Sequence, residues 1–153
     1  AMVDVLEVVP AEHPKTPWLQ GRFKAFIDAT LTYQHNSGTW YQVTDLGSRE
    51  GNYLEASGTA MLTYAMAKGA SLKFLPEEYK AHAEKGFAGL LDQMISVNPD
   101  TNVISLEQVC AVAGLGGNPY RDGSFDYYMS EPIRANDAKG VGPFILAAHY
   151  LNK

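Results

Sequence analysis

Residues 55–68 read EASGTAMLTYAMAK, and their apolar side chains fall on nearly every side of the helix that this segment would form. A helix that is apolar all round is buried on most sides, so we expect this one at the centre of the protein. Gly69 is predicted to end it, because glycine is common just beyond a helix C-terminus. Residues 140–150 are almost wholly apolar and predict a second buried helix.

Two further helical segments have a single apolar face. Residues 18–34 place their apolar side chains on one stripe, and residues 76–94 do the same, with Pro76 at the first helical turn. Such helices lie on the outside of a fold. The first nine residues also have helical spacing and stop at Pro10; their apolar stripe comprises Met2, Val5, Leu6 and Val9.

Buried and one-faced helices alternate along the chain, which predicts two concentric layers of helices in one domain, 1–153. The longer loops, 40–53 and 115–139, each precede a buried helix, so we expect them to gather at one end, around the N-termini of the inner helices. Loops longer than about 12–15 residues are usually functional or disordered, and these hold aromatic and charged side chains. Short strands are expected at 39–43 and within 103–113.

Composition excludes several classes of function. The net charge is −5 and lysines and arginines are scattered, so no basic surface for nucleic acid or anionic membrane is predicted. No run approaches the ~18–20 apolar residues of a membrane span. The single cysteine, Cys110, lies in an apolar run and is expected to be a buried thiol; the four histidines have no metal-ligand spacing.

A first candidate site combines Trp40 and Gln42 with Tyr53 and Glu55. Flat apolar rings together with amide and carboxylate groups are what sugar rings require of a binding site. The alternative is helix capping, with Asn52 or Ser57 as the cap and Glu55 favourable to the helix dipole. The sequence leaves both interpretations open for Glu55.

A second candidate site is the segment 119–140, which holds three tyrosines, four carboxylates and three basic residues. Tyr127, Tyr128 and Asp126 lie in its middle, and Lys139 near its end. The alternative is a loop ordered by internal ion pairs, with Asp137 as the N-cap of the last helix and Lys139 paired to Asp137 or Asp126.

Four motifs in order resemble one family of carbohydrate-cleaving enzymes. They are GTWYQV at 38–43, NYLEASGTAM at 52–61, DGSFDYY at 122–128 and NDAKGVGPF at 136–144. Together they resemble the C-terminal half of unsaturated rhamnogalacturonyl hydrolases, glycoside hydrolase family 105, which is related to the unsaturated glucuronyl hydrolases of family 88. The resemblance runs over the whole chain.

The resemblance implies an all-α fold of the (α/α)6-barrel type, here an incomplete C-terminal portion of about two and a half helical hairpins. It also implies a reaction. An Asp protonates the C4=C5 bond of the unsaturated uronic acid that a polysaccharide lyase leaves, water adds at C5, and the hemiketal opens. No metal or organic cofactor takes part. In the family that Asp precedes the position matching residue 1, so we expect a cut first helix, no catalytic residue here, and no activity of the chain alone.

The residues of this chain that match the family's motifs correspond to one wall of the family's substrate cleft. Tyr127 and Tyr128 match a tyrosine pair associated with substrate contact, and one of them is expected to contact the sugar while the other supports the loop. Lys139 is a candidate partner for the substrate carboxylate. The remaining substrate-facing candidates are Trp40, Gln42, Tyr53, Glu55 and Asp126.

The expected ligand is an unsaturated uronyl oligosaccharide, with no nucleic acid or membrane partner. Inner-helix surface is expected to be exposed at Met61, Tyr64, Phe144 and Ile145, which predicts a homo-oligomer or association with the missing N-terminal half. Two alternatives are a non-catalytic carbohydrate-binding module and an oligomerising half-barrel. The sequence specifies neither the disaccharide nor the compartment.

Overall fold

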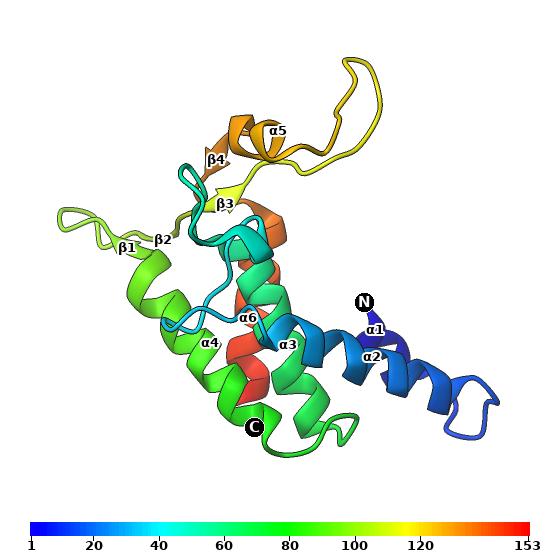
Figure 1. Cartoon of the computed structure of the whole chain (residues 1–153). Coiled ribbons are helices and arrows are strands. Elements are labelled where there is room, and N and C mark those ends of the chain that lie inside the picture. The colour runs from blue at the N-terminus through cyan, green and yellow to red at the C-terminus, as the bar shows by residue number, and fades with distance from the viewer.

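The computed structural model describes all 153 residues, and most of its regular structure is helical (Figure 1). The predicted all-α fold class is therefore confirmed. A 3-10 turn spans Thr44–Leu46. The helices are α1 (Met2–Val8), α2 (Thr16–Leu31), α3 (Ala56–Ser71), α4 (Tyr79–Met94), α5 (Phe125–Ser130) and α6 (Ala138–Leu151). The short strands are β1 (Ile95–Val97), β2 (Ile104–Leu106), β3 (Val109–Cys110) and β4 (Ile133–Arg134).

Helix α3 lies at the centre, as its sequence predicted. Most of its residues are buried, and it packs against α1, α4 and α6. The prediction that Gly69 ends this helix was wrong, because α3 continues to Ser71. A Cβ atom at Gly69 would lie 2.8 Å from Leu75 Cδ1 and 3.0 Å from a ring carbon of Phe23. The glycine thus allows close packing rather than a helix end.

Helices α2 and α4 bury one face each, as expected of outer helices. Helix α2 buries Phe23 and Ile27, although Phe26 on the same predicted stripe is 49% exposed. Helix α4 begins at Tyr79 rather than at Pro76, because the preceding residues close a turn through i→i−3 bonds such as Tyr79 N–H to the Pro76 carbonyl, 3.2 Å.

The side of α4 that faces the turn at 37–39 approaches the backbone closely. A Cβ atom at Gly89 would lie 2.3 Å from the Ser37 carbonyl oxygen, and one at Gly86 would lie 2.4 Å from Thr63 Oγ1. Only glycine permits this contact. Gly89 therefore brings the turn against α4, and Gly86 brings α4 against Thr63 of α3.

Helix α1 is joined to α3 by charge as well as by apolar packing. It buries Val3 and Leu6, whereas Met2 and Val5 of the predicted stripe are exposed. The buried face of α1 is therefore rotated relative to the predicted stripe, with only Leu6 in common. Charged side chains explain the difference, since Lys68 of α3 is only 3% exposed and lies under this helix.

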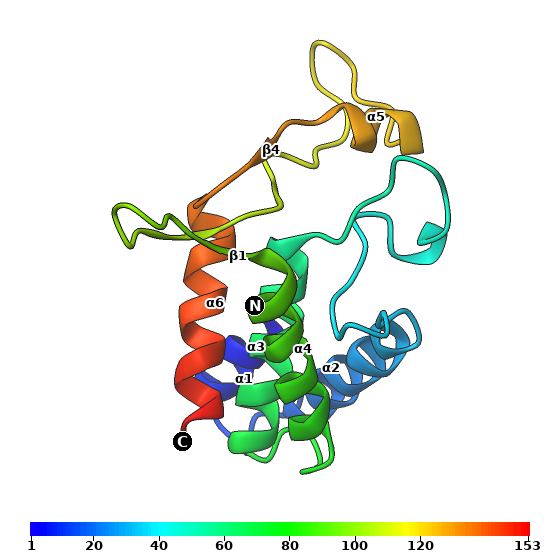
Figure 2. The ribbon, with the colours of Figure 1, turned by 90° about the vertical axis from the view of Figure 1, so that its left-hand side faces the viewer.

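The long loops gather at one end of the molecule, beyond the N-termini of α3 and α6, as predicted (Figures 1 and 2). Strands β1 and β2 form an antiparallel hairpin there, and β3 pairs antiparallel with β4. The expected strand pair within 103–113 was wrong in its partners, because β2 and β3 belong to separate sheets. The expected strand at 39–43 is reduced to one bridge between Tyr41 and Leu54.

Helix α6 is more exposed than its sequence predicted. Ile145 is 60% exposed, as expected, and Met61 of α3 is 44% exposed. Tyr64 was expected to be exposed but is buried, and Phe144 is half-buried because it stacks on Phe87 with ring centroids 5.1 Å apart. None of the helices combines the length and the apolar character that crossing a membrane requires.

Candidate functional site: the loop end of α3

Glu55 is the N-cap of α3 and is 5% exposed. Its Oε2 accepts from the backbone N–H of Gly58 at 2.6 Å, and its Oε1 accepts from the Ser57 hydroxyl at 2.7 Å. Oε1 also accepts from the backbone N–H of Cys110 at 2.9 Å. Capping is therefore part of what Glu55 does, and the cap is Glu55 itself rather than Asn52 or Ser57.

Gln42 and Tyr53 lie next to this carboxylate. The Gln42 amide donates to Cys110 Sγ at 3.2 Å, and the Cys110 thiol donates to the Val112 carbonyl at 3.1 Å. The Tyr53 hydroxyl is buried and has no hydrogen-bond partner in the chain. Burial, then the neighbouring Cys110 thiol and nearby carboxylates, raise the pKa of Tyr53. The phenol therefore stays protonated and keeps a donor.

Trp40 lies in the core. It is 2% exposed, its indole N–H donates to the Thr30 carbonyl at 2.8 Å, and its backbone N–H donates to Thr59 Oγ1 at 3.0 Å. Its ring therefore holds the turn against the helices and presents no free face on which a sugar could stack.

The tyrosine pair lies on α5, a short helix whose N-cap Ser124 accepts from the backbone N–H of Tyr127 at 3.1 Å. The two rings are tilted by 53° with centroids 5.1 Å apart. The Tyr127 hydroxyl accepts from the backbone N–H of Gly114 at 3.1 Å, whereas the Tyr128 side chain makes no hydrogen bond within the chain. The nearby Glu131 carboxylate raises the pKa of Tyr127.

Charged side chains connect α5 and α6 to the neighbouring loops. Asp126, which is exposed, pairs with Arg49 at 3.5 Å, and the Arg49 guanidinium also lies 3.8 Å from the centroid of the Phe125 ring. Lys139 pairs with Asp137 at 3.1 Å and donates to the Ala111 carbonyl at 3.0 Å. Asp137 is the N-cap of α6, as the sequence suggested.

Gln42, Tyr53 and Glu55 are thus brought together around Cys110 at the N-terminus of α3, and Trp40 lies in the core. Asp126, Tyr127 and Tyr128 lie apart from them on α5. Asn136 and Cys110 also belong to the loop end of the molecule and were not proposed from sequence. Asn136 bonds the backbone N–H of Leu106 through its side chain at 2.9 Å, with a positive φ of 57°. Two signals could have found it: its place at the start of the motif at 136–144, and its type, because asparagine tolerates this conformation.

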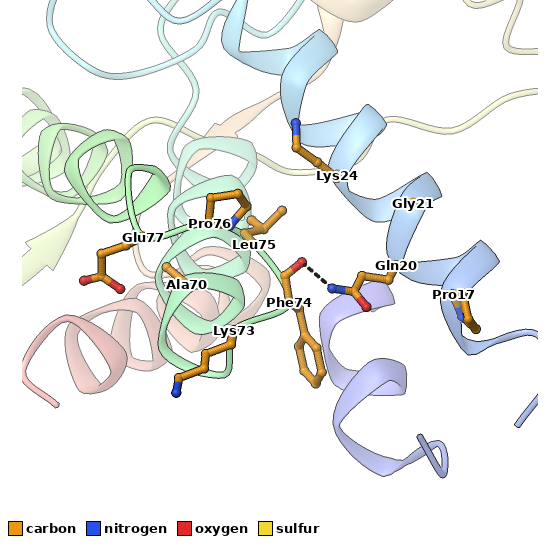
Figure 3. Close-up of a pocket in the computed structure, with 10 residues that line it drawn as sticks. All are labelled: Pro17, Gln20, Gly21, Lys24, Ala70, Lys73, Phe74, Leu75, Pro76 and Glu77. Atoms are coloured by element: carbon orange, nitrogen blue, oxygen red, sulfur yellow. Dashed lines mark hydrogen bonds between the residues drawn. The ribbon is translucent and has the colours of Figure 1, made fainter. Parts of the chain in front are cut away.

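The largest depression lies away from these loops, between α2 and the turn that joins α3 to α4 (Figure 3). It has a volume of about 750 Å³ and is open to solvent. The Gln20 amide bonds the Phe74 carbonyl across it at 3.2 Å. No group of three or more histidine, cysteine or carboxylate side chains lies close enough to hold a metal ion.

Comparison with known proteins decides the family. The model of Glycosyl Hydrolase Family 88 matches residues 1–153. The chain belongs to this family. A glycoside hydrolase from family 105 of C. acetobutylicum has 45% sequence identity and a TM-score of 0.94, with 99% of this chain and 42% of that chain covered. Membership of a glycoside hydrolase family and the partial α/α-barrel fold, both predicted from the motifs, are confirmed.

Other relatives agree. Protein Atu3128 of Agrobacterium fabrum and a 24.9 kDa protein in the picA locus of Rhizobium radiobacter are each 39% identical over 153 residues, covering 96% of this chain. A possible member of family 105 from Salmonella enterica has 24% identity and a TM-score of 0.77, and the match covers 99% of this chain and 36% of that protein. At this identity the match shows the shared fold alone. The chain spans 65% of the curated relatives' length.

Proposed function

We propose that this chain forms the substrate-facing wall of a hydrolase that removes unsaturated uronic acid from lyase-generated rhamnogalacturonan oligosaccharides. The family supports this, and so do the Gln42 amide, the Lys139 ammonium group and the tyrosine pair of α5, which lie on the loops beyond the N-termini of α3 and α6. An unsaturated uronyl ring offers a flat face and a carboxylate, which these groups complement.

Within this site we assign the sugar contact to Tyr128 and the support of the loop to Tyr127. The Tyr127 hydroxyl already accepts from the Gly114 backbone, whereas that of Tyr128 has no partner in the chain. Lys139 uses two of its three N–H donors on Asp137 and Ala111 and keeps one for the substrate carboxylate. Gln42 is the further polar contact, whereas the buried Tyr53 hydroxyl lies behind this surface.

No carboxylate of the chain is proposed as the proton donor. Glu55, Asp137 and Asp126 are engaged in hydrogen bonds or an ion pair, which supports this assignment. The chain is expected to bind the unsaturated disaccharide, observed by calorimetry, without loss of the absorbance of its double bond. If the chain turns over this substrate and changing one of its carboxylates abolishes the turnover, then the chain does contain the proton donor and the proposal is wrong.

Tyr128→Phe tests the contact, with Tyr127→Phe as its matched control. Removing the Tyr128 hydroxyl is expected to weaken binding by about 0.5–1.5 kcal/mol, or about 1.5–3 kcal/mol if its partner is the substrate carboxylate. The ring remains, so folding should change little. Equal affinity of both variants and the unchanged chain would show that neither hydroxyl contacts the sugar.

We also propose that the chain associates with a second copy of itself. Its accessible surface is 8734 Å², about 1,100 Å² more than a compact monomer of 16.7 kDa exposes. A standard interface covers about 800 Å² on each partner. Apolar side chains lie exposed on three helices: Val8 at 76%, Trp18 at 59% and Ile145 at 60%.

Light scattering at micromolar concentration tests this association. A mass of about twice 16.7 kDa is expected, and Ile145→Lys should shift the chain toward the monomer because it places a charge on the apolar surface. A monomer that binds no apolar dye would contradict the proposal.

A further inference from the structure

We propose that Glu55 is a positioning residue that tethers the tyrosine-bearing loop to the start of α3, and that it does not contact the sugar. The tether is a property of the chain itself. Its consequence for binding rests on the proposed function.

Both oxygens of the Glu55 carboxylate accept hydrogen bonds from the protein. Three donors surround it: the Ser57 hydroxyl, the Gly58 backbone and the Cys110 backbone, at 2.6–2.9 Å. The residue is 5% exposed, so solvent and ligand have little access to it. Two of these donors belong to its own helix. The third comes from a strand 55 residues further along the chain.

That third bond fixes the start of the loop at Cys110. Cys110 is the last residue of β3, which pairs with β4, and α5 with its tyrosines lies between these two strands in sequence. Residues 111–132 therefore leave the body of the protein at Cys110 and return to it at Ile133. The backbone N–H of Ala56 donates to the Gln108 carbonyl at 2.9 Å and supports the same junction.

Lys139 and Asn136 hold the loop at two further points. Lys139 donates to the Ala111 carbonyl at 3.0 Å, and the Asn136 side chain accepts from the Leu106 backbone at 2.9 Å. Beyond these anchors the loop is exposed, with Leu115 at 68% and Tyr120 at 78%. Apart from the exposed contact of Arg49 with Asp126 and Phe125 of α5, these anchors lie at the base of the loop, so losing one should loosen the loop without unfolding the helices.

Side-chain length separates tethering from capping. In Glu55→Asp the carboxylate is one methylene shorter. Aspartate is a good N-cap, so the bond to the Gly58 backbone can be kept. It can no longer also reach the Cys110 backbone. Ser57→Ala is the matched control, because it removes one donor to the same carboxylate and leaves the Cys110 bond in place.

The sole cysteine reports directly on the tether, because Cys110 is 3% exposed and reacts with iodoacetamide only when β3 opens. We expect its alkylation rate to rise about tenfold or more in Glu55→Asp, since a hydrogen bond to a charged group holds a segment closed by at least that factor. The rate should rise less than threefold in Ser57→Ala, roughly within the range of a neutral bond.

Ile27→Val separates local opening from global unfolding. Ile27 is fully buried on α2, so this variant destabilises the whole fold without touching the loop. The proposal is supported if Glu55→Asp reacts much faster than Ile27→Val at equal or higher melting temperature. An unchanged rate in Glu55→Asp overturns it, and so does a rise that merely follows the melting temperature, as a pure cap would give.

Affinity for the unsaturated rhamnogalacturonan disaccharide tests the link to the site. If the unchanged chain binds it, Glu55→Asp should bind at least threefold more weakly, and Ser57→Ala should bind nearly as well. Equal affinity of Glu55→Asp despite a reactive Cys110 overturns the positioning role. If the unchanged chain does not bind, the proposed function fails, while the alkylation rates still decide whether the tether exists.

Discussion

Helix α3 carries one buried charged side chain near each end, and the two are satisfied in different ways. Glu55 at its start meets only neutral donors, and one of these belongs to the distant strand β3. Lys68 near its other end meets two carboxylates, Asp4 at 2.7 Å and Glu7 at 2.8 Å, both from α1. The first arrangement ties a loop to the helix, and the second ties a helix to a helix.

The difference follows from what each partner can bury. Helix α1 adds Val3 and Leu6 to the apolar core beside the ion pairs, so its attachment is shared between packing and charge. The loop from Cys110 to Ile133 contributes almost no buried apolar side chain beyond its base, so its attachment depends on hydrogen bonds and on the contact of Arg49 with Asp126 and Phe125. We therefore expect stability to reside in the helices and local opening in the loops.

Phe23→Ala should have the largest effect, because Phe23 is 2% exposed in the core between α2 and α3. Removing a buried aromatic ring costs about 3–5 kcal/mol of unfolding free energy. Urea denaturation measures this loss. A loss below 1 kcal/mol would mean that the helical body is not where the stability resides.

Lys68→Met should be next, because it leaves Asp4 and Glu7 without their partner. Breaking a fully buried pair costs 3–5 kcal/mol, but both carboxylates are nearly half exposed, so we expect about 1.5–3 kcal/mol. A double-mutant cycle checks the cause: Asp4→Asn should destabilise less in the Lys68→Met background than in the unchanged chain. Purely additive effects would exclude a charge interaction between α1 and α3.

The same cluster predicts a dependence of stability on pH. Burial of the Asp4 carboxyl group favours its neutral form, but hydrogen bonds from Lys68 and Tyr64 outweigh this and lower its pKa from 3.8 to about 2. A lowered pKa in the folded state stabilises the protein above pH 3.8, and that contribution is lost as pH falls toward 2.

The loss from Asp4 should be about 1 kcal/mol after allowance for solvent screening, since its side chain is 44% exposed. Urea denaturation at pH 4.5 and pH 2 measures it, with Asp4→Asn as the control in which this part of the pH dependence disappears. An identical pH dependence in Asp4→Asn would show that other groups dominate.

Tyr120→Ser should have the smallest effect. Tyr120 is 78% exposed at the tip of the loop, so the free energy of unfolding should change by no more than about 0.5 kcal/mol. Thermal unfolding measured beside Phe23→Ala gives the two extremes of the comparison. A loss as large as that of the core variant would mean that the loop tip packs against the body.

Much of the helical body could be predicted from sequence, because helix periodicity records how many sides of a helix are buried. The apolar circumference of 55–68 predicted the central helix, and the order of helices and loops predicted that the long loops share one end. The predicted end of α3 was wrong, because Gly69 allows close packing against Leu75 and Phe23. Local sequence does not show that these two side chains pack against Gly69.

The roles of individual polar residues were decided by tertiary structure. Sequence spacing showed that Glu55 stands at a helix start, and capping is a local interaction within three residues. Its bond to Cys110 joins residues 55 positions apart, and Trp40 lies in the core with its indole bonded to Thr30 of α2 and its backbone to Thr59 of α3. Local patterns specify which sides of a helix avoid water. Only the folded chain specifies which distant donor meets a given carboxylate, because that depends on how the helices pack.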